Sequence, residues 1–108
     1  MSNKNTSIYV IGPPEGPFKI GYSASPTHRL SSLQTGTTEY LMLHYSEETE
    51  TDKAKVIEKM IHRTLAHKRI RGEWFKVTLE EAIAEVKFAF IRWDGEDELT
   101  VRFKRKLI

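Results

Sequence analysis

The sequence predicts a small α/β domain of the α+β kind, in which helices flank a three-stranded and mainly antiparallel sheet. Three observations predict it. Residues 7–11 and 18–22 alternate apolar and other side chains with the period of two that strands require. Residues 52–67 instead repeat apolar side chains at helical spacing. A chain of 108 residues can build one hydrophobic core but not two. The expected element order is β-β-α-β-α(-β)-α.

The first two strands are expected to pair as a hairpin, because residues 12–17 between them are rich in glycine and proline. The first helix is predicted to start at Ser25 and Pro26, since serine caps helix N-termini and proline favours the first turn. Gly36 is predicted to end this helix. Its apolar side is formed by Leu30 and Leu33.

The second half of the chain predicts a third strand at 40–45, followed by an acidic, threonine-rich segment that leads into a long helix at 52–67. Residues 73–77 are compatible with an extended segment. The apolar stripe of the long helix consists of Ala54, Ile57, Ile61 and Leu65.

Thr78 and Glu81 have the spacing of a capping box and predict the start of the last helix. The face that this helix should bury carries Leu79, Ile83, Val86 and Phe90. Asp94 and Gly95 predict a turn. Residues 99–103 then alternate again, which indicates a possible C-terminal strand.

The composition excludes several classes of site. The chain has no cysteine, so a disulfide framework, a thiolate zinc site and a cysteine nucleophile are all impossible. No apolar run approaches the roughly 20 residues that a membrane-spanning helix needs, and the first six residues are polar. We therefore expect a cytoplasmic protein that does not contact a membrane.

Charge is unevenly distributed, although the formal net charge is only +2. Residues 59–71 contain five lysines or arginines and two histidines but no acid, and residues 102–106 form a second basic cluster. Acidic residues gather instead at 47–52 and 94–98. Such segregation fits a positive strip that lies against a phosphate backbone, and it fits ordinary solvated faces equally well.

The order of short motifs resembles that of the GIY-YIG nuclease family. Ser-Ile-Tyr at 7–9 stands where the family has Gly-Ile-Tyr, and Lys-Ile-Gly at 19–21 stands where it has Tyr-Ile-Gly. Arg29 follows on a helix and Glu58 on a later one. The segment Gly-Glu-Trp-Phe at 72–75 is similar to a small phage and bacterial branch of the family. The resemblance extends from about residue 7 to residue 77.

This resemblance implies a nuclease domain at 7–93, preceded by a flexible tail at 1–6 and followed by a turn and a basic strand or tail of the same domain at 94–108. The implied activity is an endonuclease that hydrolyses DNA phosphodiester bonds with Mg²⁺ or Mn²⁺. Such chemistry needs an activated water, neutralised phosphoryl charge and help for the leaving oxygen.

By the resemblance, four residues carry the catalysis. Tyr9 would activate or orient the attacking water, Lys19 and Arg29 would contact the phosphate, and Glu58 would bind the metal as a hard oxygen ligand. A phenol with an ordinary pKa of about 10 can act as a base only if nearby cations or a metal lower that pKa. We expect Lys19 and Arg29 to supply that field.

Further residues are expected near the substrate. The missing side chain of Gly21 would let a substrate or the next helix come close. His62 lies one helical turn after Glu58, so it would order Glu58 or contact substrate. His28 and Tyr22 are expected beside the cleft. Arg63, in the basic stretch, is expected to bind substrate as well.

Two features modify the nuclease hypothesis. One carboxylate and one imidazole, with no cysteine to complete the set, argue against zinc. Many relatives also carry an asparagine after the metal glutamate, whereas this chain has no asparagine after Asn5. Trp74 and Phe75 are expected to be core aromatics rather than platforms on which bases stack.

Two alternatives stay open beside the endonuclease. One is a catalytically weak or inactive relative that binds DNA or RNA through the basic helix and tail. The other is a protein-interaction module, such as a phage accessory factor that acts on a host protein. A second copy of the chain is a further candidate partner.

Overall fold

The computed structural model describes residues 4–94, and its centre is an antiparallel sheet with the strand order β3-β1-β2-β5-β4. The strands are β1 (Thr6–Gly12), β2 (Phe18–Ser23), β3 (Met42–Thr49), β4 (Arg69–Arg71) and β5 (Trp74–Phe75). The predicted α+β class is therefore confirmed. The sheet has five strands, however, and not three.

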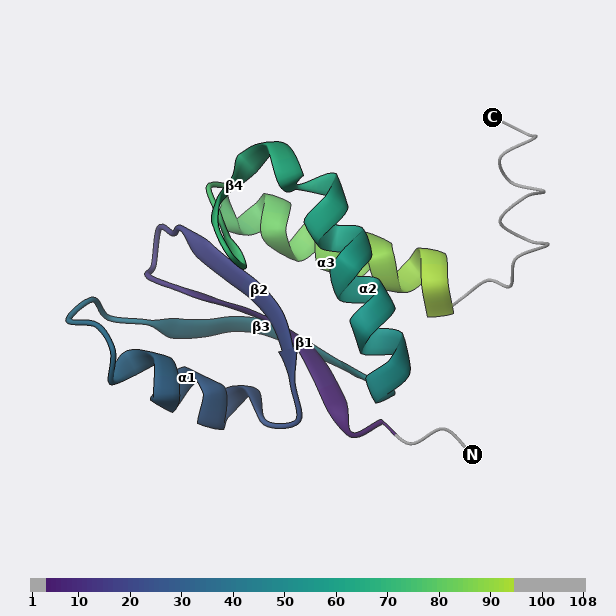
Figure 1. Cartoon of the computed structure of the whole chain (residues 1–108), viewed down its shortest axis with the longest axis horizontal. Coiled ribbons are helices and arrows are strands. Elements are labelled where there is room, and N and C mark those ends of the chain that lie inside the picture. The colour runs from purple at the N-terminus through teal and green to yellow at the C-terminus, as the bar shows by residue number, and fades with distance from the viewer. Residues whose placement is uncertain (1–3, 95–108) are drawn as a thin grey trace.

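Helices cover both faces of the sheet. They are α1 (Pro26–Gln34), α2 (Thr51–Thr64) and α3 (Leu79–Asp94), with a short 3₁₀ helix, η1 (Ala66–Lys68), after α2. Figure 1 shows α1 alone on one face, whereas α2 and α3 lie together on the other. The structure describes no helix that is long and apolar enough to cross a membrane.

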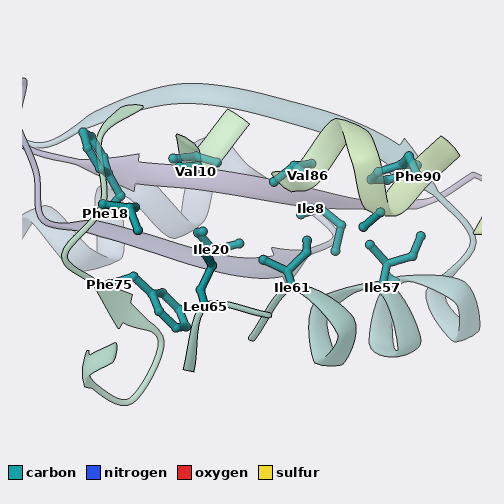
Figure 2. Close-up of a cluster of buried hydrophobic side chains, with 14 residues drawn as sticks. Ile8, Val10, Phe18, Ile20, Ile57, Ile61, Leu65, Phe75, Val86 and Phe90 are labelled. Carbon is teal, nitrogen blue, oxygen red and sulfur yellow. The ribbon is translucent and has the colours of Figure 1, made fainter. Parts of the chain in front are cut away.

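The predicted hairpin is confirmed, and its register decides which side chains face which helix. Val10 pairs with Ile20, and Tyr9 pairs with Gly21. Because successive strand residues point to opposite faces, Val10 and Ile20 enter the large core under α2 and α3, whereas Tyr9 enters a small core under α1. Figure 2 shows side chains of β1, β2, α2 and α3 meeting in the large core.

The prediction of a third strand at 40–45 was wrong in its bounds, because β3 runs from Met42 to Thr49. Its acidic second half belongs to the strand since it pairs along β1, with Glu48 opposite Ser7 and Thr49 opposite Thr6. Pairing with an existing strand outweighed the weak strand tendency of this polar segment.

The extended segment expected at 73–77 is confirmed in part as β5, which forms a hairpin with the unpredicted β4 through a two-residue turn at Gly72 and Glu73. Gly72 has φ of 55°, which glycine adopts without steric cost and which the first position of such tight turns demands. The strands have only three and two residues, so neither shows a periodicity that a sequence could reveal.

The predicted helices agree with the structure more closely than the predicted strands do. The last helix starts with the expected capping box, in which Thr78 Oγ1 accepts from the Glu81 N–H and Glu81 Oε1 accepts from the Thr78 N–H, both at 3.0 Å. The long helix stops at Thr64 and not at residue 67. Asp94 ends α3, while Gly95, the predicted strand at 99–103 and the second basic cluster lie outside the described residues.

Candidate active site

A polar cleft of about 370 Å³ opens beside the middle of the sheet. Its lining residues come from β1, β2, α1, α2 and the turn before β5. They are Tyr9, Tyr22, Ser23, Arg29, Glu58 and Glu73. Three of the four residues predicted to carry catalysis, Tyr9, Arg29 and Glu58, therefore share one cleft.

The cleft exists because β5 is short. It pairs with β2 only at Phe18 and Lys19, so the described chain leaves the rest of that edge of β2 without a strand partner. Gly21 lies just beyond the paired part and has no side chain to fill the gap. Glu58 can therefore line the same cleft as Tyr9, although α2 and Tyr9 lie on opposite faces of the sheet.

Because Gly21 has no side chain, two side chains of the cleft, Tyr9 and Glu73, can lie close to its backbone. A Cβ at this position would stand 2.6 Å from Tyr9 Oη and 2.7 Å from Glu73 Oε1. Both distances are too short for any real Cβ, so the phenol and the carboxylate occupy the space that a larger residue would need. These contacts give Gly21 a packing role, and the expected close approach of a substrate or helix stays a prediction.

Glu58 presents a partly buried carboxyl group to the cleft. Its Oε2 atom is buried and has no hydrogen-bond partner among the described residues. Burial, followed by the charge of Glu73 and a hydrogen-bonding contact with it, raises the pKa of Glu58 to about 7, and the weaker attraction of Lys19 opposes this rise. The neutral form of Glu58 is therefore favoured to a higher pH than in an ordinary glutamate.

Glu73 is held over the cleft by the turn and by Lys19. Lys19 Nζ lies 3.1 Å from Glu73 Oε1. The backbone is fixed as well, because the Ile20 N–H donates to the Glu73 carbonyl at 3.0 Å. Gly21 lies on β2, between β1 and β5. The Glu73 carboxylate thus enters the cleft from the β5 side of Gly21, whereas Tyr9 enters it from the β1 side.

Lys19 does not line the cleft. Its side chain is only 11% exposed, it bonds Glu73, and its ammonium lies 5.8 Å from the centre of the Trp74 ring. The prediction that Lys19 contacts the phosphate directly does not match this placement. Its charge instead acts on the cleft through the Glu73 carboxylate.

Tyr9 of β1 and Arg29 of α1 both line the cleft, and the guanidinium lies close enough to the phenol to affect its pKa. Burial is the largest effect on the pKa of Tyr9 and raises it, and the charges of Glu73 and Glu58 raise it further, against the lowering effect of Arg29. Arg29 lowers this pKa as expected, but desolvation and two carboxylates outweigh the arginine, so the net shift is upward.

The structure assigns three other predicted residues to different places. His62 Nε2 donates to the Ile20 carbonyl at 2.7 Å and its ring lies 5.0 Å from that of Phe75, so it ties α2 to β2. His28 is exposed on α1, where its N–H donates to the Ser25 cap. Arg63 is exposed on α2. None of the three lines the cleft.

Sequence reasoning missed Glu73 and Ser23 as cleft residues, while Tyr22 was expected there. The segment at 72–75 carried the resemblance, but nothing within it indicated that Glu73 meets Glu58, fifteen residues earlier. The available signal was weak: an acid at a glycine turn, directly after a basic stretch.

The donor set fits a hard divalent cation. Glu58 offers a buried oxygen without a partner, and Glu73 stands beside it. The described residues hold no group of three or more His, Asp or Glu side chains that could enclose a metal. A cation that keeps several waters and takes one or two carboxylates, as Mg²⁺ does, matches this arrangement, and zinc does not.

Comparison with known proteins identifies the family. The model of the T5orf172 domain matches residues 6–90, which is most of the chain. The chain belongs to the T5orf172 domain family. T5orf172 domains are phage-associated and are found in homing and nuclease-like proteins. This membership suggests a nuclease or DNA-binding module. No curated protein and no solved structure matches the chain significantly. The finer GIY-YIG assignment stays a prediction from the motifs.

Proposed function

We propose that this T5orf172 domain is a metal-dependent endonuclease that hydrolyses DNA phosphodiester bonds. One observation carries the proposal: a single cleft brings a phenol and a guanidinium together with a pair of carboxyl groups, one of which has a buried oxygen without a partner among the described residues. These are the groups that water activation, phosphate binding and hard-metal binding require.

Glu58 and Glu73 would hold Mg²⁺ or Mn²⁺, which when bound neutralises charge on the phosphoryl oxygens. Arg29 supplies the positive charge of the cleft lining. Its planar guanidinium binds a nonbridging phosphate oxygen through its N–H donors. The Lys19 ammonium holds the Glu73 carboxylate in position through their ion pair.

Tyr9 is the proposed group that takes the proton from the attacking water. Two of the causes that raise its pKa are the charges of Glu73 and Glu58. Once those charges are neutralised, they no longer oppose ionisation, and Arg29 remains to favour the phenolate. The same carboxyl pair thereby controls the base as well as the phosphate charge.

A supercoiled-plasmid assay with Mg²⁺, Mn²⁺ or EDTA tests the proposal. We expect metal-dependent nicking or linearisation that falls by roughly 10²-fold or more in Glu58→Gln and in Tyr9→Phe. Glu80→Gln and Tyr40→Phe are matched controls, since both residues are exposed on the surface away from the cleft. Absence of cutting by the folded parent with every metal, or equal cutting by the variants, would refute it.

The alternative is a nucleic-acid-binding or protein-interaction module without catalysis. The observation in its favour is the Lys19–Glu73 ion pair, which already neutralises one of the two carboxylates. Under this alternative Glu58→Gln leaves DNA binding unchanged and no cutting is seen in the parent. A steep fall in DNA binding with added salt would then separate a nucleic-acid module from a protein-binding one.

A further inference from the structure

A second hollow of about 480 Å³ lies next to the cleft, on the α1 face of the sheet. Its walls are mainly apolar. The apolar residues that line it are Pro13, Pro17, Leu33, Leu41, Ile70 and Trp74. We call this hollow the Trp74 groove. The endonuclease chemistry proposed above uses none of these residues.

The Trp74 groove and the cleft are adjacent. Glu73 lines the cleft and Trp74, the next residue in the chain, lines the groove. Lys19 lies near both residues, with Nζ 3.1 Å from Glu73 Oε1 and 5.8 Å from the centre of the Trp74 ring. The cleft and the groove are thus lined by consecutive residues, whose Cα atoms are only about 3.8 Å apart.

Hydrogen bonds fix one wall of the groove, the loop after α1, without any bound molecule. The Gln34 side chain crosses the loop after α1, where its Nε2 donates to the Glu39 carbonyl at 2.7 Å and its Oε1 accepts from the Leu41 N–H at 2.9 Å. The Glu39 N–H also donates to Thr37 Oγ1 at 3.1 Å. Sites for small groups are usually preformed in this way.

The rim of the groove is basic and exposed. Arg71 lines it, Arg69 lies two residues earlier, and all of β4 is exposed at the edge of the sheet. Ile70 between them is 55% exposed. An apolar, aromatic floor beside two arginines and next to a phosphate-binding cleft has the chemistry of a base-binding pocket with a backbone contact at its rim.

We propose that the Trp74 groove holds one unstacked base of the nucleic acid, next to the phosphate bound in the cleft, with Arg71 on the adjoining phosphate. This inference rests on the proposed function, because the cleft must bind a phosphodiester. Taking a base out of a duplex stack is unfavourable, and least so where the nucleotide is already unpaired. The substrate class is therefore DNA with a single-stranded or unpaired nucleotide beside the cut.

The test measures binding by fluorescence anisotropy in EDTA, so that no cutting takes place. Three labelled duplexes are compared: fully paired, with one unpaired nucleotide, and with an abasic site in place of that nucleotide. We expect the unpaired nucleotide to improve binding about 10-fold and the abasic site to remove that gain, since stacking of one base has this magnitude.

Two exposed positions test the groove without threatening the fold. Ile70→Ala and Arg71→Ala should lose most of the preference for the unpaired base. Ile91→Ala and Arg92→Ala are matched controls on α3, where both residues are exposed, and should keep it. In a Trp93→Phe background, Trp74 fluorescence should be quenched by the unpaired nucleotide but not by the abasic duplex.

The outcomes separate the two proposals. Base-dependent binding that the groove variants abolish, in a protein that never cuts, supports the groove and refutes the endonuclease. Cutting without any difference between the three duplexes overturns the groove and leaves the endonuclease standing. Unchanged nucleic-acid binding by Ile70→Ala and Arg71→Ala also overturns the groove proposal.

Discussion

The carboxyl group of Glu58 is half-buried beside that of Glu73, and both burial and the neighbouring charge disfavour its ionised form. The folded protein holds a proton on Glu58 up to a pKa of about 7, compared with the ordinary value of 4.5. The folded state thus binds this proton more tightly than the unfolded state. The resulting stability is present below pH 4.5 and is lost as the pH rises through about 7.

We therefore expect Glu58→Gln to raise the free energy of unfolding at pH 8, by about 1 kcal/mol once the partial exposure of the group is allowed for. At pH 4.5 the same variant should differ little from the parent, because both side chains are then neutral. Urea unfolding at several pH values checks this. Glu80→Gln should show no such pH dependence, and a less stable Glu58→Gln at pH 8 would contradict the placement of the two carboxyl groups.

Gly21 is the position in the site where an added side chain would be most crowded. Gly21→Ala should reduce stability by about 1–3 kcal/mol, because the new methyl group overlaps Tyr9 Oη and Glu73 Oε1. It should also abolish any metal-dependent cutting, since both groups must move. Gly36→Ala is the matched control, because its nearest contact would be the Leu33 carbonyl at 3.6 Å, an ordinary distance. Thermal unfolding of both variants tests the difference.

Among the helices, α3 depends on the capping box at its start. The reciprocal bonds of Thr78 and Glu81 satisfy backbone N–H groups that have no partner within the helix. Glu81 also accepts from Lys68 Nζ at 2.7 Å, which joins the start of α3 to η1. The cap therefore holds together two segments that flank the β4–β5 hairpin.

Thr78→Ala should accordingly lower the free energy of unfolding by about 1 kcal/mol, the usual loss when a capping hydroxyl is removed. Thr64→Ala, at the exposed C-terminal end of α2, is the matched control and should change stability by less than about 0.5 kcal/mol. Denaturant unfolding measures both. Equal losses in the two variants would show that the capping box contributes no specific stabilisation.

Across the molecule, the two faces of the sheet are packed very unequally. Among residues 4–94, the core under α2 and α3 contains fourteen buried residues, whereas that under α1 contains three, Tyr9, Ile11 and Leu41. No residue of α1 itself is buried. Because local stability follows buried contacts, α1 should open at a lower free energy than the rest of the domain.

Native-state hydrogen exchange tests this difference. Amide protons of α1 should exchange faster than those of α2 and β1 by at least about 10-fold, through openings smaller than global unfolding. Since Arg29 lies on α1, such openings would also uncover the cleft. Equal protection of α1 and α2 would instead show that the domain opens only as one unit.

Local sequence patterns determined much of this protein. Period-two alternation predicted the β1–β2 hairpin, helical periodicity predicted α2, and the spacing of Thr78 and Glu81 predicted the start of α3. These signals depend on side chains only a few residues apart, so the chain shows them without its tertiary context. The motif order also singled out Tyr9, Arg29 and Glu58, which do share one cleft.

Tertiary structure alone decided the rest. The strands β4 and β5 are too short to show a periodicity, and the sequence indicates only an extended segment at 73–77; the strands form because β2 and a glycine turn provide their partners. That pairing carries Glu73 to Glu58 and to Lys19, and Lys19 stays outside the cleft lining. Burial, with the charges of Glu73 and Glu58, raises the pKa of Tyr9. Electrostatic and packing effects of this kind depend on distances between residues far apart in the chain, and only folding sets those distances.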